Sequence, residues 1–218
     1  MADVIGSYQY WQQRLTNLGC EMLPEWKPYF TFMDESYVHE LSDAMARAAI
    51  TSPAPEVVFR PFQDIRPCDI KVVILGQDPY PNPEDAIGRA FASVSQKMPR
   101  SLATIMRAAG GFNGARNAAL DGWVDQGVFL LNACPVLYEG SSKPNNHWER
   151  FTSQIIHQLY VRQRPKYILM GKRAQHYAKY VGDPDLIIDL PHPTARAGQF
   201  AACSPFDVIR LLCPEIVW

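Results

Sequence analysis

The stretch VVILGQDPYP, residues 72–81, decides the fold, because four apolar residues run into a glycine, an amide, a carboxylate and two prolines. Such an apolar run predicts a buried strand. Gly76 and the prolines on either side of Tyr80 end it abruptly, which leaves Gln77 and Asp78 at its carboxyl end. A plainer interpretation, a stiff turn in which Asp78 accepts from nearby backbone amides, stays open on this stretch alone.

Apolar runs of strand length alternate along the chain with segments of helical spacing. This alternation predicts right-handed crossovers and a three-layer α/β/α sandwich around a central, mainly parallel four-stranded sheet. The predicted strands are 70–75, 127–133, 166–171 and 185–190, and the predicted helices are 8–18, 37–48, 100–109, 147–163, 173–181 and 204–212.

Length and composition favour one compact domain over residues 1–218, in which residues 1–61 form a helical region without a recognisable motif. The proline-rich segment 51–70 is expected to wrap the surface. The first residues lack the pattern of a signal peptide, and the chain has no apolar run of membrane-spanning length. We therefore expect an intracellular protein, cytoplasmic or nuclear according to its source, that does not bind a membrane.

Charge and cysteine content narrow the function classes. The formal net charge is −1, so binding to nucleic acid would have to use a local patch rather than a globally basic surface. The five cysteines are scattered and form no C-x-x-C pair, and the histidines show no metal-ligand spacing. These patterns predict neither a disulfide framework nor a metal, and no cofactor is expected.

Polar side chains follow each of the four predicted strands. The segments concerned are GQDPYP (76–81), NACP (132–135), GKR (171–173) and PHPTARAGQF (191–200). Since ligands of open parallel sheets bind beyond the carboxyl ends of the strands, these segments are expected to line one cleft. The convergence makes a purely structural explanation of Asp78 harder to sustain.

These segments resemble the family-1 uracil-DNA glycosylases. Residues 76–80 are similar to the cellular signature G-Q-D-P-Y-H, and HPTARA (192–197) is similar to H-P-S-P-L-S. The segments GRAFASV (88–94), MPRSL (98–102) and GWVDQGVFLLNACPVL (122–137) resemble three further family motifs in the same order. The resemblance runs from about residue 62 to the end of the chain.

Three departures from the cellular pattern are visible. Pro81 replaces the histidine of the first signature, Lys172 stands where a serine usually follows the glycine, and a Thr-Ala-Arg run begins at Thr194. These features look more like the poxvirus branch, whereas Gln77 follows the cellular form. The source of the chain therefore stays open.

The resemblance implies a monofunctional glycosylase that hydrolyses the bond from deoxyribose C1′ to uracil N1 and leaves an abasic site. It assigns Asp78 to stabilising the sugar cation and positioning water, and His192, acting neutral, to hydrogen bonding with uracil O2. It also makes Asn132 the residue that reads uracil. Tyr80 excludes the thymine methyl group, and Phe91 stacks on the base, although an aromatic residue in such a stretch would otherwise be assigned to the core.

Six more residues complete the expected site, apart from Arg196. Gln77 is expected to contribute contacts to the uracil pocket. Pro81, Ser101 and Thr194 are expected to contact DNA, and so is the turn at Gly171 and Lys172, although Lys172 as a solvated charge at a helix start is an equal alternative.

Arg196 occupies the place, four residues after the motif histidine, where cellular relatives carry a leucine wedge. Its guanidinium can stack on bases and donate to phosphates. An exposed loop arginine with no such role is the alternative interpretation.

Two other classes of function remain open. The chain could act chiefly as a DNA-binding or replication-scaffold subunit, as poxvirus-type relatives do within a polymerase complex. It could also be a glycosylase for mismatched thymine or one with an iron–sulfur cluster, which Tyr80 and the cysteine pattern respectively argue against. The expected partners are uracil-containing DNA, single- or double-stranded, and a DNA-mimic inhibitor protein or replication partner, with the chain itself a monomer.

Overall fold

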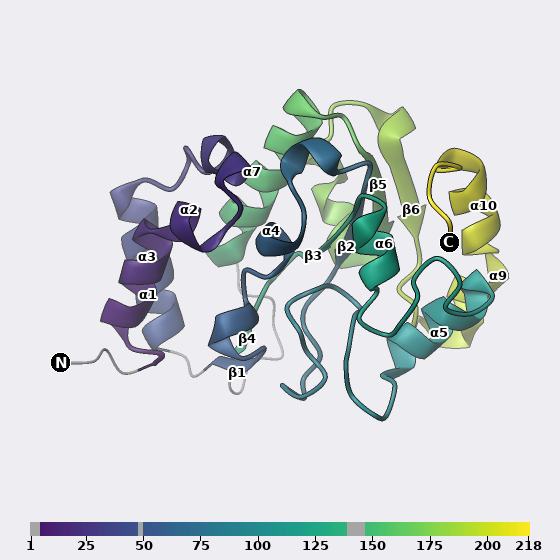
Figure 1. The fold of residues 1–218 in the computed structure, drawn as a ribbon, viewed down its shortest axis with the longest axis horizontal. Coiled ribbons are helices and arrows are strands. Elements are labelled where there is room, and N and C mark those ends of the chain that lie inside the picture. The colour runs from purple at the N-terminus through teal and green to yellow at the C-terminus, as the bar shows by residue number, and fades with distance from the viewer. Residues whose placement is uncertain (1–4, 48–49, 139–146) are drawn as a thin grey trace.

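A computed structural model describes residues 5–47, 50–138 and 147–218. Its centre is a four-stranded parallel sheet in the order β3-β2-β5-β6, with helices around it, as the sequence predicts (Figure 1). The strands are β2 (Val72–Gly76), β3 (Val128–Asn132), β5 (Lys166–Met170) and β6 (Ile187–Leu190). Every residue of β2 and β3 is buried, which explains their continuous apolar sequence.

The chain changes direction beside β2. It passes from β2 to β3 on one side, and then through α7 (His147–Arg162) to β5 on the other side. The registers place Gly76 opposite Asn132, so the carboxyl ends of β2 and β3 lie level. A strand-order reversal of this kind is where open α/β sheets bind their ligands.

The helices besides α7 are α1 (Tyr8–Thr16), α2 (Leu18–Glu21), α3 (Glu35–Arg47), α4 (Pro61–Asp64), α5 (Arg100–Ala109), α6 (Asp121–Asp125), α8 (Lys172–Gln175), α9 (Gln199–Ala202) and α10 (Pro205–Leu212) in the described residues. They follow the predicted segments closely, and the range of α5 agrees with its prediction. The predicted helix 173–181 is instead the short helix α8 followed by a 3₁₀ turn, and the end of the predicted helix 37–48 lies outside the described residues.

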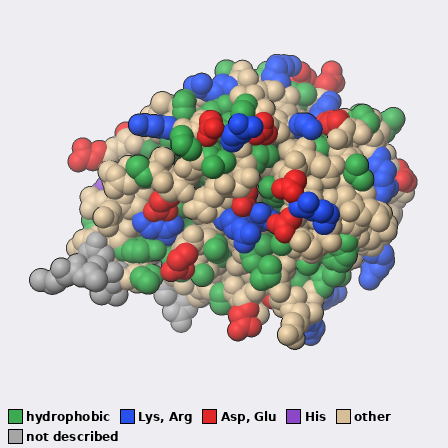
Figure 2. Space-filling view, in the orientation of Figure 1, with side chains coloured by type: hydrophobic (Ala, Val, Ile, Leu, Met, Phe, Trp, Pro, Cys, Tyr) green, Lys and Arg blue, Asp and Glu red, His purple; other side chains and the backbone are tan. Residues whose placement is uncertain are grey.

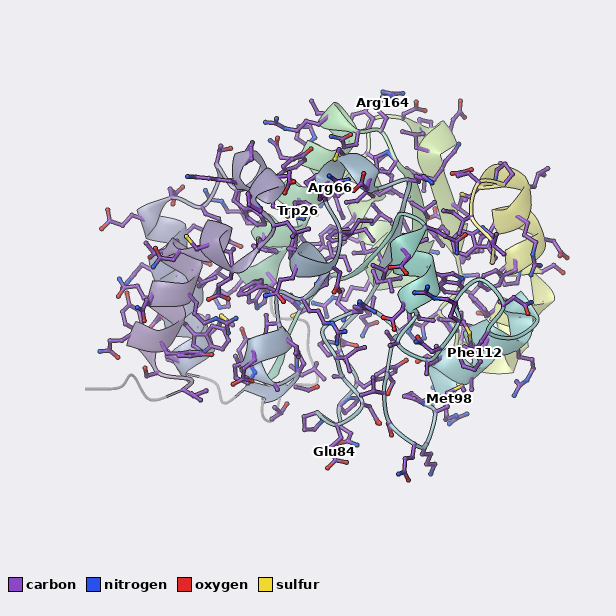
Figure 3. All side chains as sticks on the ribbon, viewed as in Figure 1. Trp26, Arg66, Glu84, Met98, Phe112 and Arg164 are labelled. Atoms are coloured by element: carbon purple, nitrogen blue, oxygen red, sulfur yellow. The ribbon has the colours of Figure 1, made fainter. Side chains whose placement is uncertain are left out.

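The amino-terminal helices pack onto the same apolar core as the sheet. The ring of Trp26 lies 4.9 Å from that of Phe62 and 5.2 Å from that of Phe129 on β3, and its indole N–H donates to the carbonyl of Ile65 at 2.8 Å. In Figure 1, α1, α2 and α3 gather at one end of the molecule, and α9 and α10 lie at the other. Trp26 lies between the amino-terminal helices and the sheet (Figure 3).

The segment 51–70 does more than wrap the surface, so that prediction is wrong in part. Phe59 and Phe62 are fully buried, because the prolines around them redirect the chain inward at short helical turns. The segment also begins in a small antiparallel sheet that the sequence did not reveal, formed by β1 (Ile50–Ser52) and β4 (Leu137–Tyr138). Strands of two or three residues are too short to show a periodic pattern.

Charged side chains of both signs are interspersed on the face in Figure 2. This face therefore presents no uniformly basic surface, in keeping with the net charge of −1. None of the helices in the described ranges has the length and apolar character to cross a bilayer.

Candidate active site

A pocket of about 380 Å³ lies beyond the carboxyl ends of β2 and β3. It brings together most of the residues that the sequence singled out, including the carboxylate, the amide and the histidine from three strand ends. The lining residues are Gln77, Asp78, Pro79, Tyr80, Pro81, Asp85, Ala86, Gly88, Arg89, Phe91, Pro99, Arg100, Ser101, Asn132, His192 and Thr194.

Gly76 ends β2 against two residues of the pocket lining, and a glycine is needed there because of how closely they approach. A Cβ atom there would lie 2.7 Å from Oδ1 of Asn132 and 3.2 Å from Cε2 of Phe91. The first distance is shorter than van der Waals contact allows, so the missing side chain lets the amide and the aromatic ring approach the strand end. The abrupt glycine in the opening stretch therefore serves the pocket as well as the turn.

Asn132 is the last residue of β3 and is 96% buried, with 4% of its surface exposed. The N–H of Ala133 donates to the carbonyl of Gly76 at 3.0 Å, and that of Cys134 donates to the carbonyl of Gln77 at 3.0 Å. These bonds extend the β2–β3 ladder past the strand ends. They fix the backbone from which the amide side chain enters the pocket.

Phe91 lies in the pocket wall with a positive φ of 62°. A bulky residue rarely adopts this conformation, so the surrounding contacts must hold it there. Its ring centre is 6.1 Å from that of His192, at an interplanar angle of 49°. The two rings therefore form adjacent surfaces of one pocket.

Tyr80 contacts three other segments of the chain. Its phenol donates to the carbonyl of Phe91 at 2.6 Å and accepts from the hydroxyl of Ser101 at 3.2 Å, while its own carbonyl accepts from the hydroxyl of Ser52 at 2.6 Å. Burial raises the pKa of Tyr80 to about 12, so the phenol stays protonated at neutral pH. The residue is a fixed, uncharged wall.

Asp78 is half-buried, and its Oδ2 accepts from Nε2 of Gln77 at 3.0 Å. The carboxylate thus faces the pocket with a neighbouring amide as its partner. No three His, Cys, Asp or Glu side chains in the described part of the chain are grouped as a metal-ligand set.

His192 follows β6 and is held in one tautomer. Its Nδ1 accepts from the backbone N–H of Thr194 at 3.2 Å and lies 2.9 Å from the hydroxyl of Thr194. A neutral ring with an acceptor at Nδ1 carries its proton on Nε2. Burial lowers the pKa of His192, against the smaller opposite effect of the Asp78 charge, so the ring is neutral at pH 7.

Gly171 supports His192 from the end of β5. Its φ is +94°, and a Cβ atom there would lie 3.0 Å from Cβ of the histidine. Both the positive φ and the close approach favour glycine at this position. Gly171 and Lys172, which the sequence assigned to DNA contact, lie outside the pocket lining, and Lys172 is exposed.

Arg196 also lies outside the pocket lining and is exposed. It begins a 3₁₀ turn in which Ala197 and Gly198 have positive φ values of 57° and 65°. Within the described residues its side chain makes no hydrogen bond or ion pair. Two further loops project at the lower edge of the molecule in Figure 3, where they carry Glu84 and Met98.

Sequence reasoning missed Arg89, which lines the pocket with only 7% of its surface exposed. Its guanidinium donates to Asp64 at 2.6 Å, to Asp121 at 2.6 Å and to the carbonyl of Ala119 at 2.7 Å. A buried arginine needs such partners. An arginine within the apolar segment 88–92 was the available signal, but its partners lie 25 and 32 residues away along the chain.

Comparison with known proteins identifies the class. Residues 62–209 match the Uracil DNA glycosylase superfamily, and the chain belongs to this superfamily. It is 36% identical over 210 residues to a uracil-DNA glycosylase of Nocardioides sp., with 89% of each chain covered. It is 31% identical over 209 residues to that of Mycoplasma genitalium, with 88% of this chain and 84% of the relative covered.

Solved structures of uracil-DNA glycosylases have the same fold as this chain. The mimivirus uracil-DNA glycosylase superposes with a TM-score of 0.72 at 28% identity, covering 88% of this chain and 77% of the mimivirus chain. A crystal structure of UNG from Nitratifractor salsuginis has the same fold, with a TM-score of 0.63 at 21% identity, covering 94% of this chain and 96% of that one. Two variants of the mimivirus UNG have been solved in complex with UGI.

Proposed function

We propose that this protein is a uracil-DNA glycosylase, an enzyme that hydrolyses the N-glycosidic bond of uracil in DNA and leaves an abasic site. The observation that carries the proposal is the pocket, in which Asp78, Asn132 and His192 converge from three different strand ends. Membership of the superfamily and the curated relatives named uracil-DNA glycosylase give the same answer. The reaction starts base excision repair.

Asp78 supplies the negative charge that this reaction needs. As the bond breaks, positive charge builds on the deoxyribose, and a carboxylate beneath the sugar stabilises it. The same carboxylate positions the attacking water. The Gln77 amide that donates to Oδ2 of Asp78 holds the carboxylate in place without neutralising it.

His192 acts on the leaving group. Most glycoside hydrolases use a second carboxyl to protonate the leaving oxygen. Departing uracil is a delocalised anion, so a hydrogen bond at O2 suffices. The contact from Thr194 to Nδ1 leaves the proton on Nε2, which makes the neutral ring a donor for that oxygen.

Asn132 selects the base through hydrogen-bond polarity. Its amide oxygen accepts from uracil N3–H and its NH₂ group donates to O4, whereas cytosine reverses both groups. Each buried mismatch costs roughly 1–3 kcal/mol, and a polar pocket of this kind rejects the wrong base by on the order of 10⁴-fold. The bonds that extend the β2–β3 ladder keep the amide in its place.

Tyr80 and Phe91 recognise the shape of the base. Thymine differs from uracil by a C5 methyl group, which only a rigid wall can exclude, and Tyr80 supplies that wall. Phe91 provides the surface on which uracil stacks. Its positive φ is the cost of presenting the ring to the pocket rather than to the core.

Residues around the pocket contact the DNA strand. The base must leave the duplex, at a cost of a few kcal/mol. Contacts of Pro81, Thr194 and the Gly171–Lys172 turn with the strand offset this cost, and Arg196 enters the base stack as the wedge. Ser101 was also assigned to this group, although its hydroxyl already donates to Tyr80.

We also propose a family branch, a location and a protein partner for this enzyme. Pro81, Lys172 and the Thr-Ala-Arg run resemble the poxvirus branch, while the rest of the first signature follows the cellular form. We place the enzyme inside the cell as a monomer with one domain. Its expected protein partner is a DNA-mimic inhibitor or a replication factor, and the complexes of mimivirus UNG variants with UGI make the inhibitor the better supported of the two.

A uracil-release assay on single-stranded DNA tests the function, with Asp78→Asn as the matched variant. The wild type should release free uracil, and the amide, which lacks the negative charge, should lose nearly all of that activity. A wild type that binds DNA without releasing uracil would favour the scaffold hypothesis instead.

A further inference from the structure

Tyr80 is anchored at both ends by serine hydroxyls from segments that are distant in sequence. Ser52, on β1, donates to its backbone carbonyl at 2.6 Å, and Ser101, in the first turn of α5, lies 3.2 Å from its phenol oxygen. The phenol also contacts the carbonyl of Phe91 at 2.6 Å. Both serines are buried, with 0% and 7% of their surfaces exposed.

The directions of these hydrogen bonds follow from the groups involved. A carbonyl oxygen only accepts, so the phenol of Tyr80 donates its single proton to Phe91. The Ser101 hydroxyl must therefore donate to the phenol oxygen.

The position of the Ser101 proton bears on what this residue does. A phosphate offers acceptors alone, so a serine hydroxyl that binds phosphate has to donate its proton to it. The proton of Ser101 is already committed to Tyr80. This bond holds the phenol of Tyr80, and a phosphate that approaches Ser101 would compete for the same proton.

A tyrosine ring changes position by rotating about two side-chain bonds or by moving with its backbone. Ser101 and the carbonyl of Phe91 oppose the first kind of motion, because they hold the far end of the ring. Ser52 opposes the second kind, because it holds the carbonyl. The ring is thereby fixed relative to the wall formed by Phe91.

We propose that Ser101 and Ser52 are positioning residues that fix Tyr80, and so set how large a C5 substituent the pyrimidine pocket accepts. The proposal rests on the proposed function. It gives the amino-terminal region, in which no motif was found, a part in substrate selection through Ser52. It also gives Ser101 a part in base selection, beside the phosphate contact that the resemblance implies.

The test measures inhibition of the single-strand reaction by free uracil, 5-fluorouracil and thymine, whose C5 substituents rise in size. Ser101→Ala should lower the ratio of the inhibition constant of thymine to that of uracil about three- to tenfold, the effect of one lost hydrogen bond. Thr104→Ala is the matched control, because its hydroxyl lies on the same helix and donates to the carbonyl of Arg100 instead. The control should leave the ratio unchanged.

Repeating the substitutions in a Tyr80→Phe background separates the two serines. Without the phenol oxygen, Ser101→Ala should have no further effect on the ratio, whereas Ser52→Ala should keep its effect because it acts on the backbone. An equal effect of Ser101→Ala in both backgrounds would overturn the proposal. So would a rise in KM for DNA with the ratio unchanged, which is the signature of phosphate binding.

The Ser101 comparison decides the proposal where Ser52→Ala is too unstable to purify. Failure of the proposed function has a different signature. In that case the wild type would release no uracil and the free bases would not bind, whereas failure of the positioning proposal leaves uracil release intact.

Discussion

The loop that carries Tyr80 and the turn that carries Arg196 are held in very different ways. Tyr80 takes part in three hydrogen bonds to three separate segments. Arg196 is exposed, lies beside two residues of positive φ, and makes no hydrogen bond or ion pair within the described part of the chain. The residue proposed to exclude the thymine methyl group is thus held by the folded protein, whereas the proposed wedge is held by no such bond.

The largest effect is expected at the preorganised pocket, where His192 lies. His192→Ala removes the proposed donor for the leaving uracil and should reduce kcat for single-stranded substrate by on the order of 10²–10³-fold. His157→Ala, at an exposed histidine on α7, is the control and should retain full activity. A His192→Ala variant within threefold of wild type would remove this residue from the mechanism.

Substitution of Tyr80 should change which base is released more than it changes the rate of uracil release. Tyr80→Ala opens space for a C5 methyl group, so the variant should release thymine from single-stranded DNA at a rate at least tenfold above the wild-type background, the scale of one methyl group's discrimination. The readout is free thymine together with free uracil. A variant that retains uracil release and still ignores thymine would show that the steric account is wrong.

Arg196 should affect duplex DNA alone. Arg196→Ala should reduce uracil release from a duplex about tenfold, the effect of one lost stacking contact, and leave release from a single strand nearly unchanged, since a single strand has little stack to refill. Arg196→Leu should recover part of the duplex activity with a shallower salt dependence. Arg47→Ala, at an exposed arginine on α3, is the control.

Two other outcomes would change the role assigned to Arg196. Equal losses on duplex and single strand would make it a phosphate contact rather than a wedge. No loss on either substrate would leave it without a role in the reaction.

The smallest effect concerns pH. Because burial lowers the pKa of His192 below its ordinary 6.5, the neutral donor predominates at pH 6.5 and above. The value of kcat/KM for single-stranded DNA should therefore fall to half of its plateau value only below pH 6.5. A decline centred at or above pH 6.5 would mean that the histidine is not desolvated as the structure indicates.

The sheet and the pocket were predictable because their signals are local. Apolar runs located the strands, and the polar residues after them gave Asp78, Asn132 and His192, which the structure brings into one pocket. Gly76 is an example of a local signal, because a glycine at a strand end indicates that other residues approach the backbone closely. Here Asn132 and Phe91 do so.

The support around the pocket was not predictable, because it depends on pairs far apart in sequence. Ser52 lies 28 residues from the carbonyl that it holds, and the Asp121 partner of Arg89 lies 32 residues away. A serine or an arginine gives no sign of its distant partner. The small β1–β4 sheet that carries Ser52 was missed because its strands are too short to show a periodic pattern.

The most direct test of the proposed function is the identity of the base released from single-stranded DNA with uracil, cytosine or thymine at one position. We expect free uracil from the first strand, an abasic site in the product, and no detectable base from the other two. Absence of uracil release, or release of cytosine or thymine at a comparable rate, would contradict it.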